Sequence, residues 1–458
     1  MISRRVIETL RNIVGPEHLR LDPSDFEAYA TDGTKLRFMP DAVIFPGNAQ
    51  EVSAILIQAD QERFPVIPRG AGTGMSGGAL PVAGGLVLSL ERFDRILLID
   101  EDNLIAKVEP GVITAHLQAE VEKHGLFYPP DPASSDISTI GGNVAECAGG
   151  LRAVKYGVTR DYILGLTAVL PTGEILKTGV ETMKGVVGYD LTRLLIGSEG
   201  TLAVVTEITV RLMPRPETQR TMIAFFPEVA QAVETVGRII RRGVLPSTLE
   251  LMDSRSIACV RDEIDLEVPE GTKALLLIEV DGGREEVDRD ALRVRQVCEM
   301  SGVSGFLAAD DRAGAETLWE ARRNLSPSLY KLRPHKVSED IVVPRSRMAE
   351  LVKFLDAMSR RYGLPIPAFG HAGDGNLHVN IMLDKTDPLE CSKAEEIVKA
   401  LFQKVIAIGG TLSGEHGIGI TKARYLGMEI SPAGIALMQR IKKAFDPHGI
   451  LNPGKMMP

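Results

Sequence analysis

The stretch Pro68-Arg-Gly-Ala-Gly-Thr-Gly-Met-Ser-Gly-Gly78 decides the fold of the amino-terminal half of this chain. Within it, Gly72-Thr-Gly-Met-Ser-Gly77 matches the G-x-G-x-x-G pattern, but a Rossmann fold requires a helix directly after the glycines. Here Leu80-Pro81 and a strand follow, and no Gly-Lys-Ser/Thr occurs, so neither a Rossmann fold nor a Walker loop fits. The stretch is therefore either a loop of backbone N–H groups that binds a pyrophosphate, or a tight connection between strands.

Short apolar strands and small-residue loops surround this stretch. A helix and a polar connection are predicted over residues 1–37, and a helix over Ala49–Arg63. Strands are predicted at Ala42–Phe45, Val66–Pro68, Leu86–Leu90 and Leu202–Leu212. Because Pro214-Arg-Pro216 interrupts the pattern, we expect a domain over residues 38–216.

The sequence pattern changes after residue 216, where it predicts long amphipathic helices that alternate with strands. Apolar stripes at helical spacing are Ala230, Val233, Val236 and Ile240, and then Leu351, Phe354, Leu355 and Met358. Strands are expected at Thr221–Phe226, Lys273–Val280 and Val337–Val343. This pattern predicts an α+β domain over residues 217–410, an antiparallel sheet with helices on one face. A last segment, residues 411–458, contains a helix at Pro432–Phe445.

Composition narrows the class of protein. The chain has 458 residues, 44% hydrophobic and 25% charged, with a net charge of −9, which is typical of a soluble globular protein and disfavours nucleic acid as a partner. No apolar run approaches the roughly 18 residues of a membrane span, and no apolar signal core follows the first residues, so we expect a cytoplasmic protein. The four cysteines are scattered, which disfavours a disulfide framework or an iron–sulfur cluster.

Two stretches near the carboxyl end carry four of the eight histidines, Phe369-Gly-His-Ala-Gly-Asp-Gly-Asn-Leu-His-Val-Asn380 and Ser413-Gly-Glu-His-Gly-Ile-Gly419. The glycines of the first oppose a helix, so a hairpin is predicted with Asp374-Gly375 as a two-residue loop. On that register His371 faces His378 across the ladder, with Cβ atoms roughly 5 Å apart. Each histidine alone could be a hydrogen-bonded structural residue. Together they indicate two ligands of one metal ion.

Glu415 would supply a third ligand to that ion and leave a position open, as catalytic metal sites do. Neighbouring residues of an extended segment point to opposite sides. If Glu415 faces the metal, His416 is therefore available as an acid or base. Zinc, manganese and iron all suit such a ligand set.

Two further small-residue loops, Ser134-Ser-Asp-Ile-Ser-Thr-Ile-Gly-Gly-Asn143 and Gly197-Ser-Glu-Gly-Thr201, join the first loop in one pattern. The three segments resemble the FAD-binding domain of the vanillyl-alcohol oxidase superfamily. The carboxyl-terminal motifs resemble its branch of FAD-linked 2-hydroxyacid dehydrogenases, which includes glycolate oxidase catalytic subunits and D-lactate dehydrogenases. The resemblance runs from about Asp41 to Lys455 and implies a two-lobed FAD-binding domain, an α+β cap domain and a carboxyl-terminal segment that returns to the flavin.

The resemblance also implies the residues that contact FAD. The first two loops would together hold the diphosphate and ribityl parts. Gly200, Thr201 and Val205 would line the adenine end or the ring, and Asn452 would return to the flavin. The implied FAD contacts are Pro68, Arg69, Gly70, Ala71, Gly72, Thr73, Gly74, Ser76, Gly77, Gly78, Pro130, Ser134, Thr139, Gly141, Gly142, Asn143, Ala145, Gly200, Thr201, Val205 and Asn452. The first loop has no histidine, so noncovalent FAD is expected.

The family grips the substrate carboxylate with an arginine on a helix, and Leu318-Trp-Glu-Ala-Arg322 matches that place. Arg322 falls on one helix face with Leu318, Leu325 and Leu329, although Pro327 can kink the helix. Lys336 is a second candidate for the carboxylate, with a solvated lysine at a strand edge as the alternative. Asn376 joins His416, Arg322 and Lys336 as a catalytic candidate.

These inferences lead to an FAD-dependent dehydrogenase that oxidises a small D-2-hydroxy acid to the 2-oxo acid. D-lactate is the first substrate candidate, followed by glycolate or D-2-hydroxyglutarate. Electrons would pass to an external acceptor, either an iron–sulfur subunit, an electron-transfer flavoprotein or a quinone, and a partner could hold the protein at the inner membrane. A homodimer is compatible with this interpretation. The rivals are a noncatalytic FAD subunit that relays electrons and an ether-lipid synthase of the same superfamily.

Overall fold

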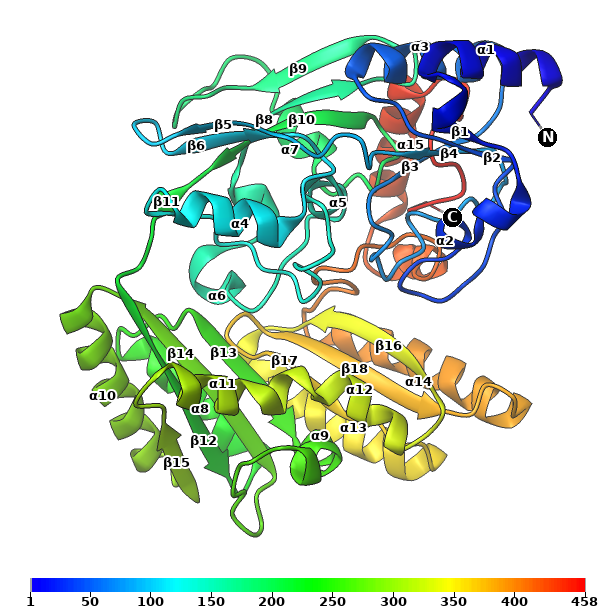
Figure 1. Cartoon of the computed structure of the whole chain (residues 1–458). Helices are drawn as coiled ribbons and strands as arrows, with labels where there is room; N and C mark the ends of the chain where they lie inside the picture. Colours follow the sequence, from blue (N-terminus) through cyan, green and yellow to red (C-terminus); the bar gives the residue numbers. More distant parts are fainter. Residues whose placement is uncertain (1, 458) are drawn as a thin grey trace. The chain divides into compact units, whose positions relative to one another are not determined.

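The structure, a computed structural model, describes residues 2–457 and divides into two compact units. The first unit comprises Met1–Gly150, Gly157–Arg215 and Glu415–Pro458, and the second comprises Leu151–Tyr156 and Pro216–Gly414. Figure 1 shows the elements of both units along the chain. Among the described residues, no helix has the length and apolar character needed to cross a bilayer.

The first unit contains three sheets. In the four-stranded sheet, of order β1-β2-β4-β3, strands β2, β4 and β3 are parallel, whereas the five-stranded sheet, of order β5-β6-β10-β8-β9, is antiparallel. The third sheet pairs β11 with β7. The strands are β1 (Leu19–Arg20), β2 (Ala42–Ile44), β3 (Val66–Arg69), β4 (Leu86–Ser89), β5 (Ile96–Asp100), β6 (Ile105–Val108), β7 (Leu126–Phe127), β8 (Ile163–Val169), β9 (Ile175–Gly179), β10 (Val204–Arg211) and β11 (Met213–Pro214).

The helices of the first unit pack their apolar stripes against these sheets. In α1 the buried residues Val6, Leu10 and Val14 recur every four positions, so one face of the helix enters the core with the strand residues Ile44 and Val66. The helices are α1 (Arg4–Val14), α2 (Glu27–Ala30), α3 (Ala49–Glu62), α4 (Thr114–Glu122), α5 (Ile140–Glu146), α7 (Leu191–Leu195) and α15 (Pro432–Phe445), with short 3-10 helices η1 (Pro16–His18), η2 (Pro23–Asp25), η3 (Thr159–Asp161) and η7 (Ala423–Met428).

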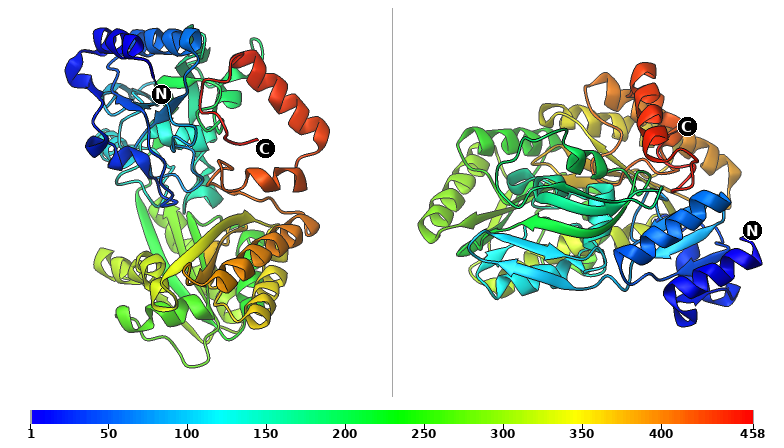
Figure 2. Two further views of the ribbon diagram at one scale, coloured as in Figure 1. Left: turned by 90° about the vertical axis from the view of Figure 1, so that its right-hand side faces the viewer. Right: turned by 90° about the horizontal axis from the view of Figure 1, so that it is seen from above.

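The carboxyl-terminal segment of the first unit returns to its four-stranded sheet. Val66 donates its N–H to the carbonyl of Ile450 at 2.8 Å, and Asn452 donates its N–H to the carbonyl of Val66 at 2.8 Å. Figure 2 shows this last segment, in red, coming back to the blue sheet after α15. The end of the chain therefore lies beside the strand that leads into the loop at Gly70.

The second unit is built on a seven-stranded sheet of order β15-β12-β14-β13-β17-β18-β16, in which every neighbouring pair is antiparallel. The strands are β12 (Thr218–Phe226), β13 (Thr248–Asp253), β14 (Ala274–Gly282), β15 (Gly305–Ala308), β16 (His335–Val342), β17 (Ala368–His371) and β18 (Asn376–Leu383).

Helices cover both faces of this sheet, so the prediction of helices on one face is wrong. Leu318, Ala321 and Leu325 share a core with Phe225 and Leu277, and Figure 1 shows α11 and α12 on the opposite side of the sheet from α8, α13 and α14. Strands buried on two faces lose the alternation that a one-sided sheet shows. The helices are α6 (Ala153–Tyr156), α8 (Val229–Arg241), α9 (Ser254–Val260), α10 (Arg284–Met300), α11 (Arg312–Arg323), α12 (Leu325–Ser328), α13 (Met348–Tyr362) and α14 (Pro388–Ala407), with η4 (Arg261–Glu263), η5 (Leu329–Lys331) and η6 (Arg345–Arg347).

The helix predicted across Leu318–Leu329 is interrupted at Asn324. The ring of a proline clashes with the carbonyl of the residue four positions earlier, and for Pro327 that residue is Arg323, the last of α11. Leu318, Leu325 and Leu329 nevertheless remain buried in one core. Arg322 consequently lies in the last turn of α11, on the sheet side of the helix.

Candidate active site

The loop after β3 has the backbone of an anion site. Within the described residues, none of the N–H groups from Gly70 to Gly78 donates a hydrogen bond to another part of the chain. Gly72 and Gly77 adopt φ of +71° and +85°, which glycine reaches without strain. A run of unpaired backbone donors fits the pyrophosphate of a dinucleotide. This loop could therefore hold the FAD diphosphate.

The Arg69 side chain supports the loop through contacts with residues outside it. Its Nη2 donates to the carbonyls of Ala28 and Thr31, both at 2.8 Å, and its guanidinium lies 5.8 Å from the ring centroid of Tyr29. A Cβ added at Gly72 would meet Arg69 Nη2 at 2.0 Å. Arg69 thus braces the loop, and any contact it makes with FAD would come from its backbone.

The second predicted loop leads into a helix instead of leaving its donors unpaired. The hydroxyl of Thr139 accepts from the N–H of Gly142 at 3.2 Å and caps α5. Asn143 donates to the hydroxyl of Thr114 at 2.8 Å, and a Cβ on Gly141 would meet Pro110 at 2.4 Å. The glycines here allow close packing of α5, and Thr139, Gly141 and Asn143 have local structural partners.

Asn452 joins the predicted FAD segments to one another. Its Nδ2 donates to the carbonyls of Gly78 at 2.9 Å and Glu199 at 2.7 Å, and its backbone takes a left-handed φ of 46°. Lys455 donates to Asn452 Oδ1 and to the carbonyl of Gly78, both at 2.8 Å. Burial lowers the pKa of Lys455 to about 8. The returning segment thus fixes the end of the first loop and the loop before Thr201.

Two carboxylates that the sequence reasoning did not single out lie behind these loops. Glu199 accepts from the N–H groups of Ile418 and Gly419, both at 2.7 Å. Glu146 is bonded only weakly to Ser76, at 3.5 Å, and its Oε2 has no hydrogen-bond partner within the described residues. Burial, and then the charge of Glu199, raise the pKa of Glu146 well above its usual range. A proton on Glu146 is therefore favoured in the folded protein.

The hairpin with the two histidines forms, but its register differs from the prediction. Phe369, not His371, is the Cα partner of His378, and residues 372–375 connect the strands, so the predicted two-residue loop is wrong. The N–H of Gly375, at a φ of 91°, donates to the carbonyl of His371 at 3.0 Å and closes this longer turn. Residues two apart share a face, so both histidines still point to the same side.

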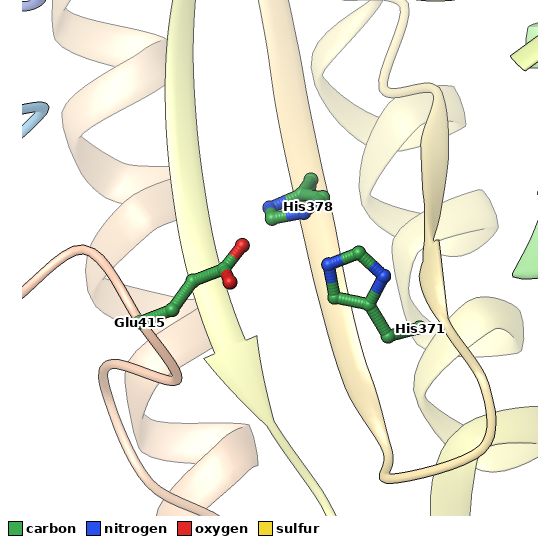
Figure 3. A group of neighbouring side chains, drawn as sticks. All are labelled: His371, His378 and Glu415. Atoms are coloured by element: carbon green, nitrogen blue, oxygen red, sulfur yellow. The ribbon is translucent and has the colours of Figure 1, made fainter. Parts of the chain in front are cut away.

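The three predicted metal ligands come together. His371, His378 and Glu415 each offer a ligand atom, and these atoms lie within 4.8 Å of one another. Figure 3 shows the two imidazoles and the carboxylate converging on a common point. The imidazole centroids are 5.3 Å apart and perpendicular, at 87°. Two nitrogens and a carboxylate at this spacing suit a divalent ion with a position left open.

Glu250 holds the outer nitrogen of His371. It is the Cα partner of His371 across β13 and β17, its Oε1 lies 2.5 Å from His371 Nδ1, and it is fully buried. Its Oε2 accepts from Arg322 Nε at 2.6 Å. Burial raises the pKa of Glu250, but the charges and hydrogen bonds of His371 and Arg322 outweigh this and bring it to about 2.

Asp340 supports the other side of the cluster. It is fully buried, is the Cα partner of His378, and its Oδ1 lies 4.0 Å from His378 Nδ1. Its two oxygens accept from Asn376 Nδ2 at 2.6 Å and from the N–H of Gly414 at 2.8 Å. Asn376, predicted as catalytic, is therefore placed as a partner of Asp340.

Three catalytic candidates remain, Arg322, Lys336 and His416. The Arg322 guanidinium stacks over Phe369 at 4.9 Å, and its side chain is 13% exposed, which leaves it a path to a ligand. Lys336 donates to Ser326 Oγ at 2.8 Å and occupies the same face of β16 as Asp340, four residues away. His416 is half-buried and lies outside the ligand group. Its predicted role as base stays a prediction.

Glu250 and Asp340 were missed because they lie far from the motifs in the sequence. Glu250 is 121 residues from His371, and Asp340 is 74 residues from Gly414. A signal existed for Glu250, since it is the one charge in the interior of the strand Thr-Leu-Glu-Leu-Met-Asp, whose other charge, Asp253, ends the strand. A buried charge of this kind requires a partner.

Comparison with known proteins agrees with this architecture. Residues 40–179 match the family described as FAD binding domain, and residues 215–456 match the family described as FAD linked oxidases, C-terminal domain. The glycolate oxidase subunit GlcD of Bacillus subtilis (strain 168) is 45% identical over 457 residues, 100% of this chain and 97% of that protein. The D-lactate dehydrogenase of Anaerostipes hadrus is 36% identical over 425 residues, 91% of this chain and 89% of that protein.

A solved structure shows the same fold. That of p-cresol methylhydroxylase with substrate bound has a TM-score of 0.82 at 19% identity, over 99% of this chain and 96% of the other. The predicted fold class, a vanillyl-alcohol oxidase-type FAD domain with an α+β cap domain, is confirmed. The chain belongs to the FAD-linked oxidases and is an FAD-linked oxidoreductase.

Proposed function

We propose that the protein oxidises a small 2-hydroxy acid, D-lactate or glycolate, to the corresponding 2-oxo acid. The observation that carries the proposal is the convergence of His371, His378 and Glu415 in a chain of this family. A subunit that only relays electrons has no need of such a group. The similarity to a glycolate oxidase subunit and a D-lactate dehydrogenase supports the substrate class.

The chemistry divides between the bound groups and the chain. FAD supplies the two-electron acceptor, and a divalent ion supplies positive charge that favours ionisation of a hydroxyl. His371, His378 and Glu415 would hold the ion. Arg322, whose fork matches a carboxylate, would orient the acid. His416 would take the hydroxyl proton, while the α-hydrogen leaves with both bonding electrons.

Turnover also requires that the two electrons leave the protein. We propose an external acceptor, either an iron–sulfur subunit, an electron-transfer flavoprotein or a quinone. The relative from Bacillus subtilis is itself named a subunit, which supports a protein partner. D-2-hydroxyglutarate is a second substrate candidate.

The experiment is dye-coupled turnover of the FAD-loaded protein against a panel of D- and L-2-hydroxy acids. We expect activity with D-lactate or glycolate, its loss after treatment with a chelator, and its return on adding zinc, manganese or iron. His378→Ala should remove the metal and the activity and retain FAD. Full activity in a metal-free preparation would refute the metal part. Lack of turnover with every acid would refute the substrate class.

A further inference from the structure

We propose that Glu250 is a positioning residue that sets the metal ligand His371 and the substrate-binding Arg322 at a fixed separation, and that it thereby selects acids whose hydroxyl and carboxylate are on adjacent carbons. The inference rests on the proposed function and deepens it. Glu250 itself contacts neither ion nor substrate. It acts through the two side chains that its carboxylate oxygens hold.

The first link fixes His371. Glu250 Oε1 lies 2.5 Å from His371 Nδ1, so with the ion bound Nδ1 would donate to the carboxylate and Nε2 would be the ligand atom. Figure 3 shows one ring nitrogen of His371 directed toward His378 and Glu415 and the other directed away. A carboxylate behind a ligand histidine fixes the tautomer and strengthens the ligand. Because Glu250 and His371 are direct partners in the sheet, the backbone itself holds this pair in place.

The second link fixes Arg322. Glu250 Oε2 takes only the Nε proton, at 2.6 Å. Within residues 2–457 neither terminal Nη group of Arg322 donates a hydrogen bond to the protein. The two Nη groups therefore form an end-on fork that can bind a carboxylate through two parallel hydrogen bonds. The guanidinium also lies over the ring of Phe369, 4.9 Å from its centroid, which is a second contact that favours this orientation.

The same ring joins the two links. Phe369 also contacts the imidazole of His378, with centroids 5.7 Å apart. The Phe369 ring therefore contacts both Arg322 and His378, and Glu250 connects Arg322 to His371. Because one carboxylate holds both His371 and Arg322, we expect an acid whose hydroxyl binds the ion and whose carboxylate binds Arg322 to need the two groups close together. A 2-hydroxy acid meets this condition, and a 3-hydroxy acid places them one carbon further apart.

The test compares Glu250→Gln with Glu279→Gln. Gln at position 250 keeps the size but has one acceptor oxygen and one NH2 group, so it can satisfy only one of the two donors. Glu279 is a buried carboxylate of the adjacent strand β14 that accepts from Thr221 at 2.8 Å and Trp319 at 3.2 Å. Within residues 2–457 it has no hydrogen bond or ion pair with His371 or Arg322, which makes it a matched control for the loss of a buried carboxyl group. Glu250→Asp keeps the charge on a side chain that is one methylene shorter, and tests whether the length of the side chain matters.

Zn²⁺ affinity is measured by calorimetry on FAD-loaded, chelator-treated protein, and KM is measured at saturating Zn²⁺ with the most active hydroxy acid. We expect Glu250→Gln to weaken Zn²⁺ binding by about 10- to 100-fold. We also expect Glu250→Gln to have a raised KM that excess Zn²⁺ does not correct, and a smaller preference for 2-hydroxy over 3-hydroxy acids. In Glu279→Gln, the Zn²⁺ affinity and KM should both stay near the wild-type values. The effects of Glu250→Gln and Arg322→Lys on KM should not add, because they act through one contact.

The outcomes separate the two proposals. If the wild type binds no Zn²⁺ and oxidises hydroxy acids without metal, the metal part of the proposed function fails. If the wild type binds Zn²⁺ and Glu250→Gln, folded and loaded with FAD, matches it in Zn²⁺ affinity and KM, the positioning role is overturned while the proposed function stands. Equal losses in Glu250→Gln and Glu279→Gln would also overturn it, since they would show only the loss of a buried charge.

Discussion

The carboxylate of Asp340 accepts a hydrogen bond of 2.8 Å from the backbone N–H of Gly414, the residue directly before Glu415. Ser413 donates its hydroxyl to the same oxygen at 3.1 Å. The segment that carries Glu415 is rich in glycine and has no regular hydrogen-bonded structure of its own. A carboxylate of β16 therefore helps to position the residues directly before Glu415, and the same carboxylate lies beside His378.

Asp340→Asn should weaken metal binding without removing any ligand. The amide would present an NH2 group either to Asn376 Nδ2 or to the N–H of Gly414, and donors do not bond to donors. We expect metal affinity to fall by about 10- to 100-fold, as for other residues behind metal ligands. Calorimetry measures this, with Ser413→Ala as a milder variant that removes one of the three bonds. Wild-type affinity in Asp340→Asn would show that the segment is positioned by other contacts.

The sequence predicted which residues make up the candidate metal site better than it predicted the register of the hairpin that carries its two histidines. Glycines, Asp374 and Asn376 oppose a helix, so a hairpin between residues 369 and 380 could be expected. Its register could not, because a turn closed by Gly375 at positive φ adds residues that no periodicity reveals. The prediction that both histidines share one face survived, since the true register differs by an even number of residues.

The supporting carboxylates could not be predicted because sequence distance hides them. Glu250 becomes a neighbour of His371 only when β13 pairs with β17, which depends on the strand order of the whole sheet. The loop at Gly70–Gly78 is the opposite case. Its excess of glycine and lack of a following helix are local properties, and they already narrowed the choice to a loop of backbone donors or a tight connection between strands.

Gly74→Ala should weaken FAD binding and leave the fold intact. Gly74 has an ordinary φ, and the nearest atom to an added Cβ is Glu146 Oε1 at 3.6 Å, so the protein tolerates a methyl group. That methyl group would occupy space beside the unpaired donors, where FAD is proposed to lie. Flavin absorbance after reconstitution and gel filtration measures the loss. Gly427→Ala, with nothing within 4 Å of the new Cβ, is the matched control.

The same preparations test noncovalent attachment. Mild denaturation should release the yellow colour into the filtrate, because the loop contains no histidine to bond to the flavin. Colour that stays with the denatured chain would contradict this. If Gly74→Ala and Gly427→Ala bind FAD equally well, the diphosphate does not approach this side of the loop.

His416→Asn and Glu415→Gln should separate the base from the ligand. Asparagine keeps a similar size and hydrogen bonding but cannot take a proton, so kcat should fall by roughly a hundred- to ten-thousandfold while metal and FAD remain. Glu415→Gln should instead lose the metal, because a neutral amide is a weaker ligand than a carboxylate. Elemental analysis and stopped-flow reduction of the flavin measure the two effects. Metal loss in a folded His416→Asn variant would reverse the assignment of the two residues.

Glu146→Gln should make the protein more stable at pH 8 than the wild type, with a smaller difference at pH 5. Burial, and then the charge of Glu199, raise the pKa of Glu146, so the folded protein keeps a proton that an unfolded glutamate loses above about pH 4.3. The folded state then binds more protons than the unfolded state, and stability falls as the pH rises toward the raised value. Glutamine has nearly the same shape and no charge, and thus removes this dependence.

Glu146 and Glu199 lie on either side of one glycine, because a Cβ on Gly417 would meet Glu146 Oε2 at 2.3 Å and Glu199 Oε1 at 2.9 Å. Removing the charge of one carboxyl group therefore affects the other. Thermal unfolding of FAD-loaded protein at pH 5, 6.5 and 8 measures the effect, with Glu207→Gln on β10 as the control for a half-buried carboxylate. Parallel stability curves for wild type and Glu146→Gln would mean that Glu146 is already ionised in the folded protein.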